Sequence, residues 1–441
     1  MTMRAISKRG GRGEFLLLSV CAFSIASVSP PALAVVASVL GVLASLQALR
    51  QEPGLVMGPN RLPLMFTVLV AVSALFSGIT RIPPIGGAVF ALWLLVPVVA
   101  AWTVSRVNLK GAAPWLAVFA VTAVGLVVMA EHAGSAVGID VYFSHIEAAE
   151  AISENEDPYS NAVSVFDGRV GAPPDTVIEG YSYPPFTMWS YAIPVWLTGD
   201  PRWLNLVAWV LVLVLVWTAS SRADPFFRGG VLALLALAPA WRLVVFTGWT
   251  EPLTLALLAL AAWQWRRRPI AAGVAFGLAL ASKQYMILLI PLLALGWRRI
   301  GGKQLIFSGV TVTMTLVPYL LVNAETYLEA TVLRFLRSEY REDTLSIPSA
   351  LADLGIDPSL PIVLAAAVSA AVALLASRRV DSFGGLMLAG AATMGTFFVL
   401  SQALTNYWFL LAGMAAIAAI DGSETKVDRR FPSLHEADPS T

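Results

Sequence analysis

Two kinds of charged side chain stand out in this apolar sequence because of their types and spacing. The stretch 138–160 is rich in carboxylates, the first of which is Asp140. The stretch 324–358 carries three arginines at +3 and +4 spacing, which puts them on one helix face: Arg334, Arg337 and Arg341. A carboxylate can take a proton from a hydroxyl group, and clustered arginines can bind a phosphate. These residue types suit the transfer of a group from a phosphate to a hydroxyl.

A third charge lies where lipid is expected. Lys283 is at the apex of an apolar hairpin between the basic clusters 266–268 and 298–299. Two full crossings need about 40 helical residues, at ~1.5 Å each across a ~30 Å core, so this hairpin is too short to emerge. A lysine at that depth is costly unless it faces a water-filled cavity or a counter-ion. We therefore expect a cation in a pocket, although a lysine that snorkels to the headgroups is the alternative.

Glu251 flanks a second apex, in "RLVVFTGWTEPL" at residues 242–253. It could pair with Arg242, or it could line a polar substrate cavity beside a helix break. The other charges also have structural alternatives. Asp140 could cap a helix N-terminus as well as act as a general base. The arginines of 324–358 could pair with acids close to them in the sequence, and the remaining acids of 138–160 suit a solvated helix face.

The composition decides which elements must position these residues. The chain is 57% hydrophobic and 13% charged, against about 25% charged for an ordinary globular domain. Several apolar runs reach the ~20 residues that cross a bilayer. The sequence therefore predicts an all-α, polytopic transmembrane protein. A basic N-terminus before "ALA" at 32–34 is also typical of a secretory signal, but we favour a first membrane helix.

Several partner and cofactor classes are not expected. The single cysteine, Cys21, makes an intramolecular disulfide impossible, and the three histidines lack ligand-like spacing. We expect no metal and no cofactor. Basic tracts interleaved with aromatic residues are absent from the sequence, so we expect no nucleic-acid partner.

Lysines and arginines gather on cytoplasmic loops, and this bias orients the helices. It places the polar loops 133–182 and 324–358 on the extracytoplasmic side, and both termini inside, with about 14 crossings. The segment 184–199 contains Pro194 and is short, so we expect it to be re-entrant or interfacial. Within the first loop, the apolar spacing in 141–155 predicts a short surface helix that ends before Asp157-Pro158. The predicted crossings include 14–30, 33–49, 62–79, 85–105, 113–131, 203–220, 304–322, 360–377, 383–402 and 405–421.

The sequence resembles the GT-C superfamily of integral-membrane glycosyltransferases, and within it glycosyltransferase family 87. The stretches that carry the resemblance span about 113–421 and are "GIDVYFSHIEAAEAISENEDPYS" at 138–160, "YSYPPF" at 181–186, "FTGWTEPLTLALLAL" at 246–260, "AAGVAFGLALASKQYMILLIPLL" at 271–293 and "SEYREDTLSIPSAL" at 338–351. Two departures are notable. The acidic loop follows the fifth membrane helix instead of the first, and Gly248 is followed by Trp249 where the family often has glutamine.

The resemblance implies an inverting transfer of a sugar, with mannose the commonest in the family, from a polyprenyl-phosphate carrier. The acceptor would be a cell-envelope glycolipid or glycan outside the plasma membrane. Asp140 matches the family's proposed base, and Lys283 matches a recurring lysine that would hold the lipid phosphate, together with arginines of the second loop. The other substrate-binding candidates on this reading are Tyr159, Tyr183, Asp157, Glu251 and His145.

The expected organisation has three parts. Residues 1–110 form an additional four-helix membrane unit. Residues 111–421 form the catalytic core with both outer loops, and 422–441 form a cytoplasmic tail. A secondary transporter or a flippase for a lipid-linked or polar solute is the alternative function. A transporter would predict inverted repeats, whereas this sequence shows no internal repeat and gathers its charge in outer loops.

Overall fold

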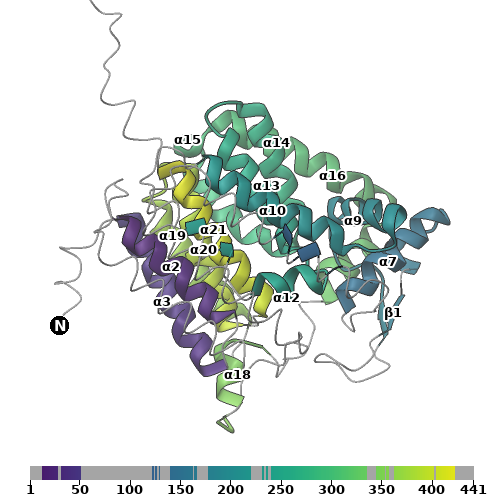
Figure 1. Ribbon diagram of the computed structural model, residues 1–441, viewed down its shortest axis with the longest axis horizontal. Helices are drawn as coiled ribbons and strands as arrows, with labels where there is room; N and C mark the ends of the chain where they lie inside the picture. The colour runs from purple at the N-terminus through teal and green to yellow at the C-terminus, as the bar shows by residue number, and fades with distance from the viewer. Residues whose placement is uncertain are drawn as a thin grey trace, which may run out of the picture.

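The computed structural model is almost entirely helical, as predicted (Figure 1). Four of its described helices are long and apolar enough to cross a membrane, and four shorter apolar helices accompany them. The predicted number of about 14 crossings depends on residues outside the described ones, and so does the predicted tail. The structure describes residues 12–27, 31–50, 122–123, 125–126, 129, 140–161, 163–165, 177–219, 231–232, 235–236, 240–334, 344–352, 354–356, 362–401 and 404–422.

The first two described helices form a hairpin that packs on the last two described helices. They are α2 (Arg12–Ala26) and α3 (Pro31–Arg50), and the proline at the start of α3 suits a first helical turn. Figure 1 shows them beside α20 (Phe383–Leu400) and α21 (Thr405–Gly422). Phe23 stacks on Trp408, with ring centroids 6.1 Å apart. The other two helices predicted for 1–110 lie outside the described residues.

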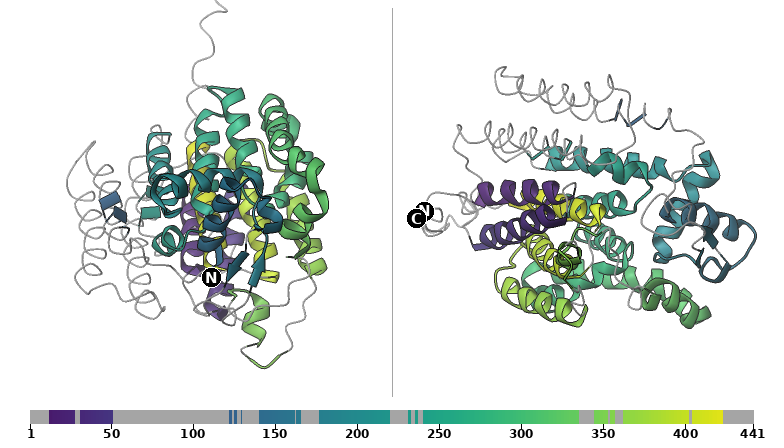
Figure 2. Two further views of the ribbon diagram at one scale, coloured as in Figure 1. Left: turned by 90° about the vertical axis from the view of Figure 1, so that its right-hand side faces the viewer. Right: turned by 90° about the horizontal axis from the view of Figure 1, so that it is seen from below.

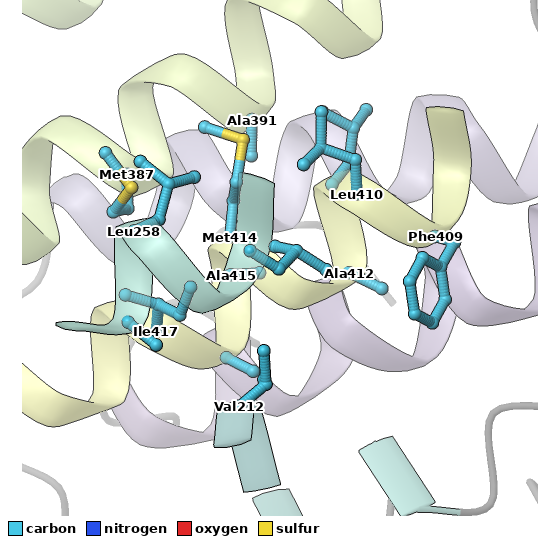
Figure 3. Close-up of a cluster of buried hydrophobic side chains, with 14 of the residues drawn as sticks. Val212, Leu258, Met387, Ala391, Phe409, Leu410, Ala412, Met414, Ala415 and Ile417 are labelled. Carbon is cyan, nitrogen blue, oxygen red and sulfur yellow. The ribbon is translucent and has the colours of Figure 1, made fainter. Parts of the chain in front are cut away.

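Apolar side chains of four helices fill the centre of the bundle (Figure 3). Val212 comes from α10 (Arg202–Ala219) and Leu258 from α13 (Glu251–Gln264). They meet Met387 of α20 and Met414 of α21, and all four side chains are buried. These helices are apolar on every side, which is typical of helices buried in a large bundle or in a membrane.

A short hairpin holds the apex that carries Lys283. It consists of α14 (Pro269–Leu280), the 3-10 helix η1 (Gln284–Leu289) and α15 (Ile290–Ile300). A helix of 12 residues rises about 18 Å, which is less than the ~30 Å of a hydrocarbon core. The geometry therefore agrees with the predicted short hairpin.

Small residues bring α14 against α16 (Gly302–Leu328). A Cβ at Gly273 would lie 2.5 Å from the carbonyl oxygen of Gln304, and one at Gly277 would lie 2.7 Å from that of Ser308. Glycines four residues apart allow this close approach between membrane helices. Ser308 also donates to the carbonyl of Gly273 at 2.9 Å. This contact fixes the position of α14 along α16 and, with it, the position of the turn that carries Lys283.

The helix α16 extends beyond its predicted end at residue 322. Its backbone bends at Asn323 (φ −155°, ψ 77°) and the helix continues to Leu328. A π-helical turn, η2 (Glu329–Leu333), follows it. The first part of the predicted outer loop 324–358 is therefore helical. The chain then passes through α18 (Ile347–Ala352) to α19 (Ile362–Ser377).

The elements of the first predicted loop gather at one end of the bundle (Figures 1 and 2). The predicted surface helix is α7 (Asp140–Ser153), which packs on α9 (Pro185–Thr198). A two-stranded antiparallel hairpin that the sequence analysis missed pairs β1 (Val163–Val165) with β2 (Val177–Glu179). Two short helices complete this end, α8 (Pro158–Asn161) and α12 (Ala240–Phe246). The α9 segment has 14 residues, too few for a straight crossing.

Candidate active site

Lys283 lies in the turn between α14 and η1 and is only 4% exposed. Its Nζ donates to Thr250 Oγ1 at 2.6 Å and to Glu251 Oε1 at 3.0 Å. The same nitrogen is 4.4 Å from the centroid of the Tyr183 ring. The expected buried cation is thus present at the apex, and its counter-ion is Glu251. The side chain of Arg242 is outside the described residues, so the predicted alternatives for Glu251, a pair with Arg242 or a polar substrate cavity, stay predictions.

Backbone anchors on both sides fix the lysine turn. Thr187 of α9 donates to the carbonyl of Ser282, and the Ser282 and Thr254 hydroxyls are 2.7 Å apart. On the opposing turn, Asn205 donates to the carbonyl of Trp249 at 2.9 Å. Buried hydroxyl and amide groups that are fully paired in this way stiffen their surroundings. The lysine turn and the turn opposite it are consequently anchored by side chains of α9, α10 and α13.

Glu251 is the first residue of α13 and is completely buried. The partial positive charge of a helix N-terminus favours a carboxylate at this position. Its Oε1 also accepts from Tyr285 Oη at 2.6 Å and from Asn406 Nδ2 at 2.8 Å. Sequence reasoning missed Thr250, Tyr285 and Asn406. The sequence did contain an indication, because Thr250 and Tyr285 are within two residues of Glu251 and Lys283, and Asn406 is a polar residue at the start of an apolar helix.

Asp140 approaches the same site from α7. It is the first residue of that helix and is partly buried. Its carboxylate is close enough to act electrostatically on both Lys283 and Tyr183. The helix predicted to begin at Asp140 is thus present, and a carboxylate in its first turn is compatible with the role of a base. The structure brings the carboxylate and the ammonium to one end of the bundle.

An aromatic wall closes the site between α8 and α16. Tyr159 donates from its hydroxyl to the carbonyl of Tyr183 at 3.0 Å, and its ring makes edge contacts with Tyr181, Tyr319 and Tyr327. Gly180 permits this packing, because its φ is +77° and a Cβ there would lie 2.2 Å from the carbonyl oxygen of Tyr159.

Asp157 supports this wall instead of facing the lysine. Its Oδ1 accepts the backbone N–H of Tyr159 at 3.0 Å, which is the contact of an N-cap at the start of α8. Arg334 follows η2 and is partly buried. Arg337 and Arg341 lie outside the described residues, so the expected arginine patch stays a prediction.

His145 is embedded in the wall at 1% exposure. It stacks face to face on Tyr191, with centroids 3.9 Å apart, and its Nδ1 is 3.0 Å from the hydroxyl of Tyr181. Burial, reinforced by the charge of Lys283 and opposed by the backbone of Gly248, lowers the pKa of His145 from 6.5 to about 3. The ring is therefore neutral at physiological pH. Its place in the stack suits a packing role more than contact with substrate.

This shift predicts how stability depends on pH. Between pH 6.5 and about 3, His145 is protonated in the unfolded chain and neutral in the folded chain. The free energy of unfolding should fall as the pH falls through this window, by at most about 1.4 kcal/mol per pH unit. Thermal unfolding in detergent between pH 7 and 4 measures this. His145→Gln should flatten the dependence; a variant with the slope of the wild type would contradict this assignment.

These observations describe a membrane-integral helical protein with a buried ion pair, a nearby carboxylate and an aromatic wall. The model of glycosyltransferase family 87 matches residues 181–403, about half of the chain. The chain belongs to glycosyltransferase family 87, as the sequence predicted. The match includes Tyr183, Glu251 and Lys283, whereas Asp140 and Asn406 lie outside it.

Two solved structures show a distant likeness. They are ArnT from Cupriavidus metallidurans in the apo state and the same protein bound to undecaprenyl phosphate. The sequence identities are 17% and 18%, and the TM-score is 0.44 for both. Each comparison covers 69% of this chain and 58% or 59% of the ArnT chain. Comparison with curated proteins finds no match.

Proposed function

We propose that this protein transfers a hexose, with mannose as the first candidate, from a polyprenyl-phosphate carrier to a glycolipid or glycan of the cell envelope. The reaction takes place on the extracytoplasmic side of the plasma membrane. The observation that carries the proposal is a buried cation, Lys283, at one end of an apolar bundle, with the Asp140 carboxylate close enough to act on it electrostatically. A buried cation suits the anionic linker of a lipid-linked donor, and a carboxylate suits its hydroxyl acceptor. ArnT, which has been solved with undecaprenyl phosphate, is consistent with such a carrier.

The chemistry is a single displacement at the anomeric carbon. Asp140 accepts the proton of the acceptor hydroxyl, and the acceptor oxygen forms a bond to the anomeric carbon. The bond from that carbon to the phosphate oxygen breaks on the opposite face, so the configuration inverts. The polyprenyl phosphate departs with the electron pair, and Lys283 stabilises its charge.

The hydrogen bonds of Lys283 indicate where the phosphate binds. An ammonium has three N–H donors. Two of them are directed at Thr250 and Glu251, which leaves one for a ligand, and the nitrogen also lies 4.4 Å from the centroid of the Tyr183 ring. We place the donor phosphate at this remaining donor, beside the Tyr183 ring, where Tyr159 and Tyr183 would border the sugar. The arginines of 324–358 are further phosphate ligands in this proposal.

Purified wild-type protein in lipid nanodiscs tests the proposal. Radiolabelled polyprenyl-phosphate mannose, supplied with an extract of envelope glycolipids, should yield a labelled glycolipid and one polyprenyl phosphate per sugar transferred. Nucleotide-activated mannose should yield neither product. The anomeric configuration of the product, read by NMR, should be opposite to that of the donor. Release of no polyprenyl phosphate with a panel of hexoses, together with solute movement across sealed vesicles, would favour a transporter instead.

A further inference from the structure

The two carboxylate oxygens of Glu251 are in opposite situations. Oε1 accepts from Lys283, Tyr285 and Asn406. Oε2 is just as buried, yet no donor reaches it from the part of the chain that the structure describes. A carboxylate oxygen left bare in this way needs an explanation, because burial without a hydrogen bond costs about 1–3 kcal/mol.

Two neighbouring side chains repeat this arrangement. Asn406 is 3% exposed and donates from Nδ2 to Glu251, while its Oδ1 lacks a donor among the described residues. Gln284, the residue after Lys283, donates from Nε2 to the carbonyl of Ser182 at 3.3 Å, and its Oε1 is bare in the same sense. Both amides are oriented by their partners, since a flip would turn an oxygen toward another oxygen.

All three bare atoms are acceptors, and they come from separate elements that meet around Lys283. Glu251 begins α13, Gln284 begins η1, and Asn406 is in the first turn of α21. Acceptor oxygens, one of them on a carboxylate, repel an anion and cannot bind the phosphate themselves. Their chemical complement is a group of hydroxyl donors.

We propose that Glu251 Oε2, Asn406 Oδ1 and Gln284 Oε1 form the subsite that accepts hydrogen bonds from the hydroxyl groups of the donor sugar. The inference rests on the proposed function, because the sugar is bonded directly to the phosphate that Lys283 holds. Hydroxyls on that sugar are then a few ångströms from the lysine, where these acceptors lie. A site of this kind selects its sugar strongly, since a missing hydroxyl leaves a buried acceptor unpaired.

The test compares binding of two lipids to the purified full-length protein: polyprenyl-phosphate mannose and polyprenyl phosphate without a sugar. Wild type should bind the mannosylated lipid about tenfold or more tightly. Asn406→Leu should lose most of this preference while its affinity for the bare lipid stays unchanged. Gln264→Leu is the matched control, because it removes a buried amide at the opposite end of α13 from Glu251 and leaves the three bare oxygens in place. It should keep the preference.

The possible failures can be told apart. Retention of the wild-type preference by Asn406→Leu, or equal weakening of both lipids, overturns the sugar subsite and leaves the proposed function standing. Failure of wild type to bind either lipid overturns both. Should Asn406→Leu not elute as a single folded species, Gln284→Met decides by the same comparison. Donors that lack the 2-, 4- or 6-hydroxyl group then identify the hydroxyl that binds here. Wild type should bind the donor without that hydroxyl more weakly than the complete donor, whereas the variant should bind both equally.

Discussion

Asp140→Asn should lower the turnover number for sugar transfer by about 100-fold or more, with little change in affinity for the donor. General-base catalysis contributes about 10²–10⁴-fold, and an amide cannot take the proton of the acceptor hydroxyl. The change is close to isosteric at the first residue of α7. Initial rates with polyprenyl-phosphate mannose in nanodiscs measure the effect, and binding of the same donor is measured in parallel.

Glu150→Gln is the matched control for Asp140, because this glutamate is exposed on the same helix. It should transfer sugar at the wild-type rate. An Asp140→Asn protein that keeps more than a third of wild-type turnover would rule out the role of base. Thermal unfolding of Asp140→Asn tests whether the loss of activity comes from loss of structure. The variant should be less stable than wild type by only about 0.3–1 kcal/mol, the free energy that a favourable charge at a helix end contributes.

Lys283→Met should remove both stability and activity. The substitution leaves Glu251, which is 0% exposed, without its counter-ion. Breaking one partner of a buried pair costs about 3–5 kcal/mol. The donor phosphate would lose its cation at the same time. Chemical unfolding in detergent, followed by tryptophan fluorescence, measures the stability, and the nanodisc assay measures transfer.

The double variant Lys283→Met with Glu251→Gln separates the two effects. Removing both charges should restore much of the lost stability, because a neutral pair of similar size is often tolerated as well as the ion pair. It should not restore transfer. A double variant less stable than either single variant would contradict the pairing, and one that transfers sugar normally would contradict the role of Lys283.

The helices and the buried lysine could both be predicted from hydropathy and from the lengths of the apolar runs. Hydropathy and chain length restrict a membrane protein strongly, so the short interval around Lys283 was enough to place a cation at membrane depth. The bounds of α2, α3, α20 and α21 differ from their predicted ranges by only a few residues at each end. The strands β1 and β2 were missed because three residues each leave too little periodicity to read.

The partners of Lys283 were much less predictable. Asn406 is 155 residues from Glu251 in the sequence, and helical spacing says nothing about contacts between elements so far apart. The end of α16 was placed too early because its polar residues were read as a loop. Alanine, glutamate and leucine in "NAETYLEATVL" are good helix formers. The helix therefore continues after its apolar part, with a bend of the backbone at Asn323 where the polar residues begin.

The stacking of Phe23 on Trp408 has a practical consequence for anyone who shortens this protein. Trp408 is on the first turns of α21, two residues after Asn406. A shortened version that starts at the family-matched region would lack α2 and α3 and would bare the indole and its apolar neighbours. Expression trials and crystallisation should therefore keep α2 and α3, because they brace the helix that brings the Asn406 amide to Glu251, the counter-ion of Lys283.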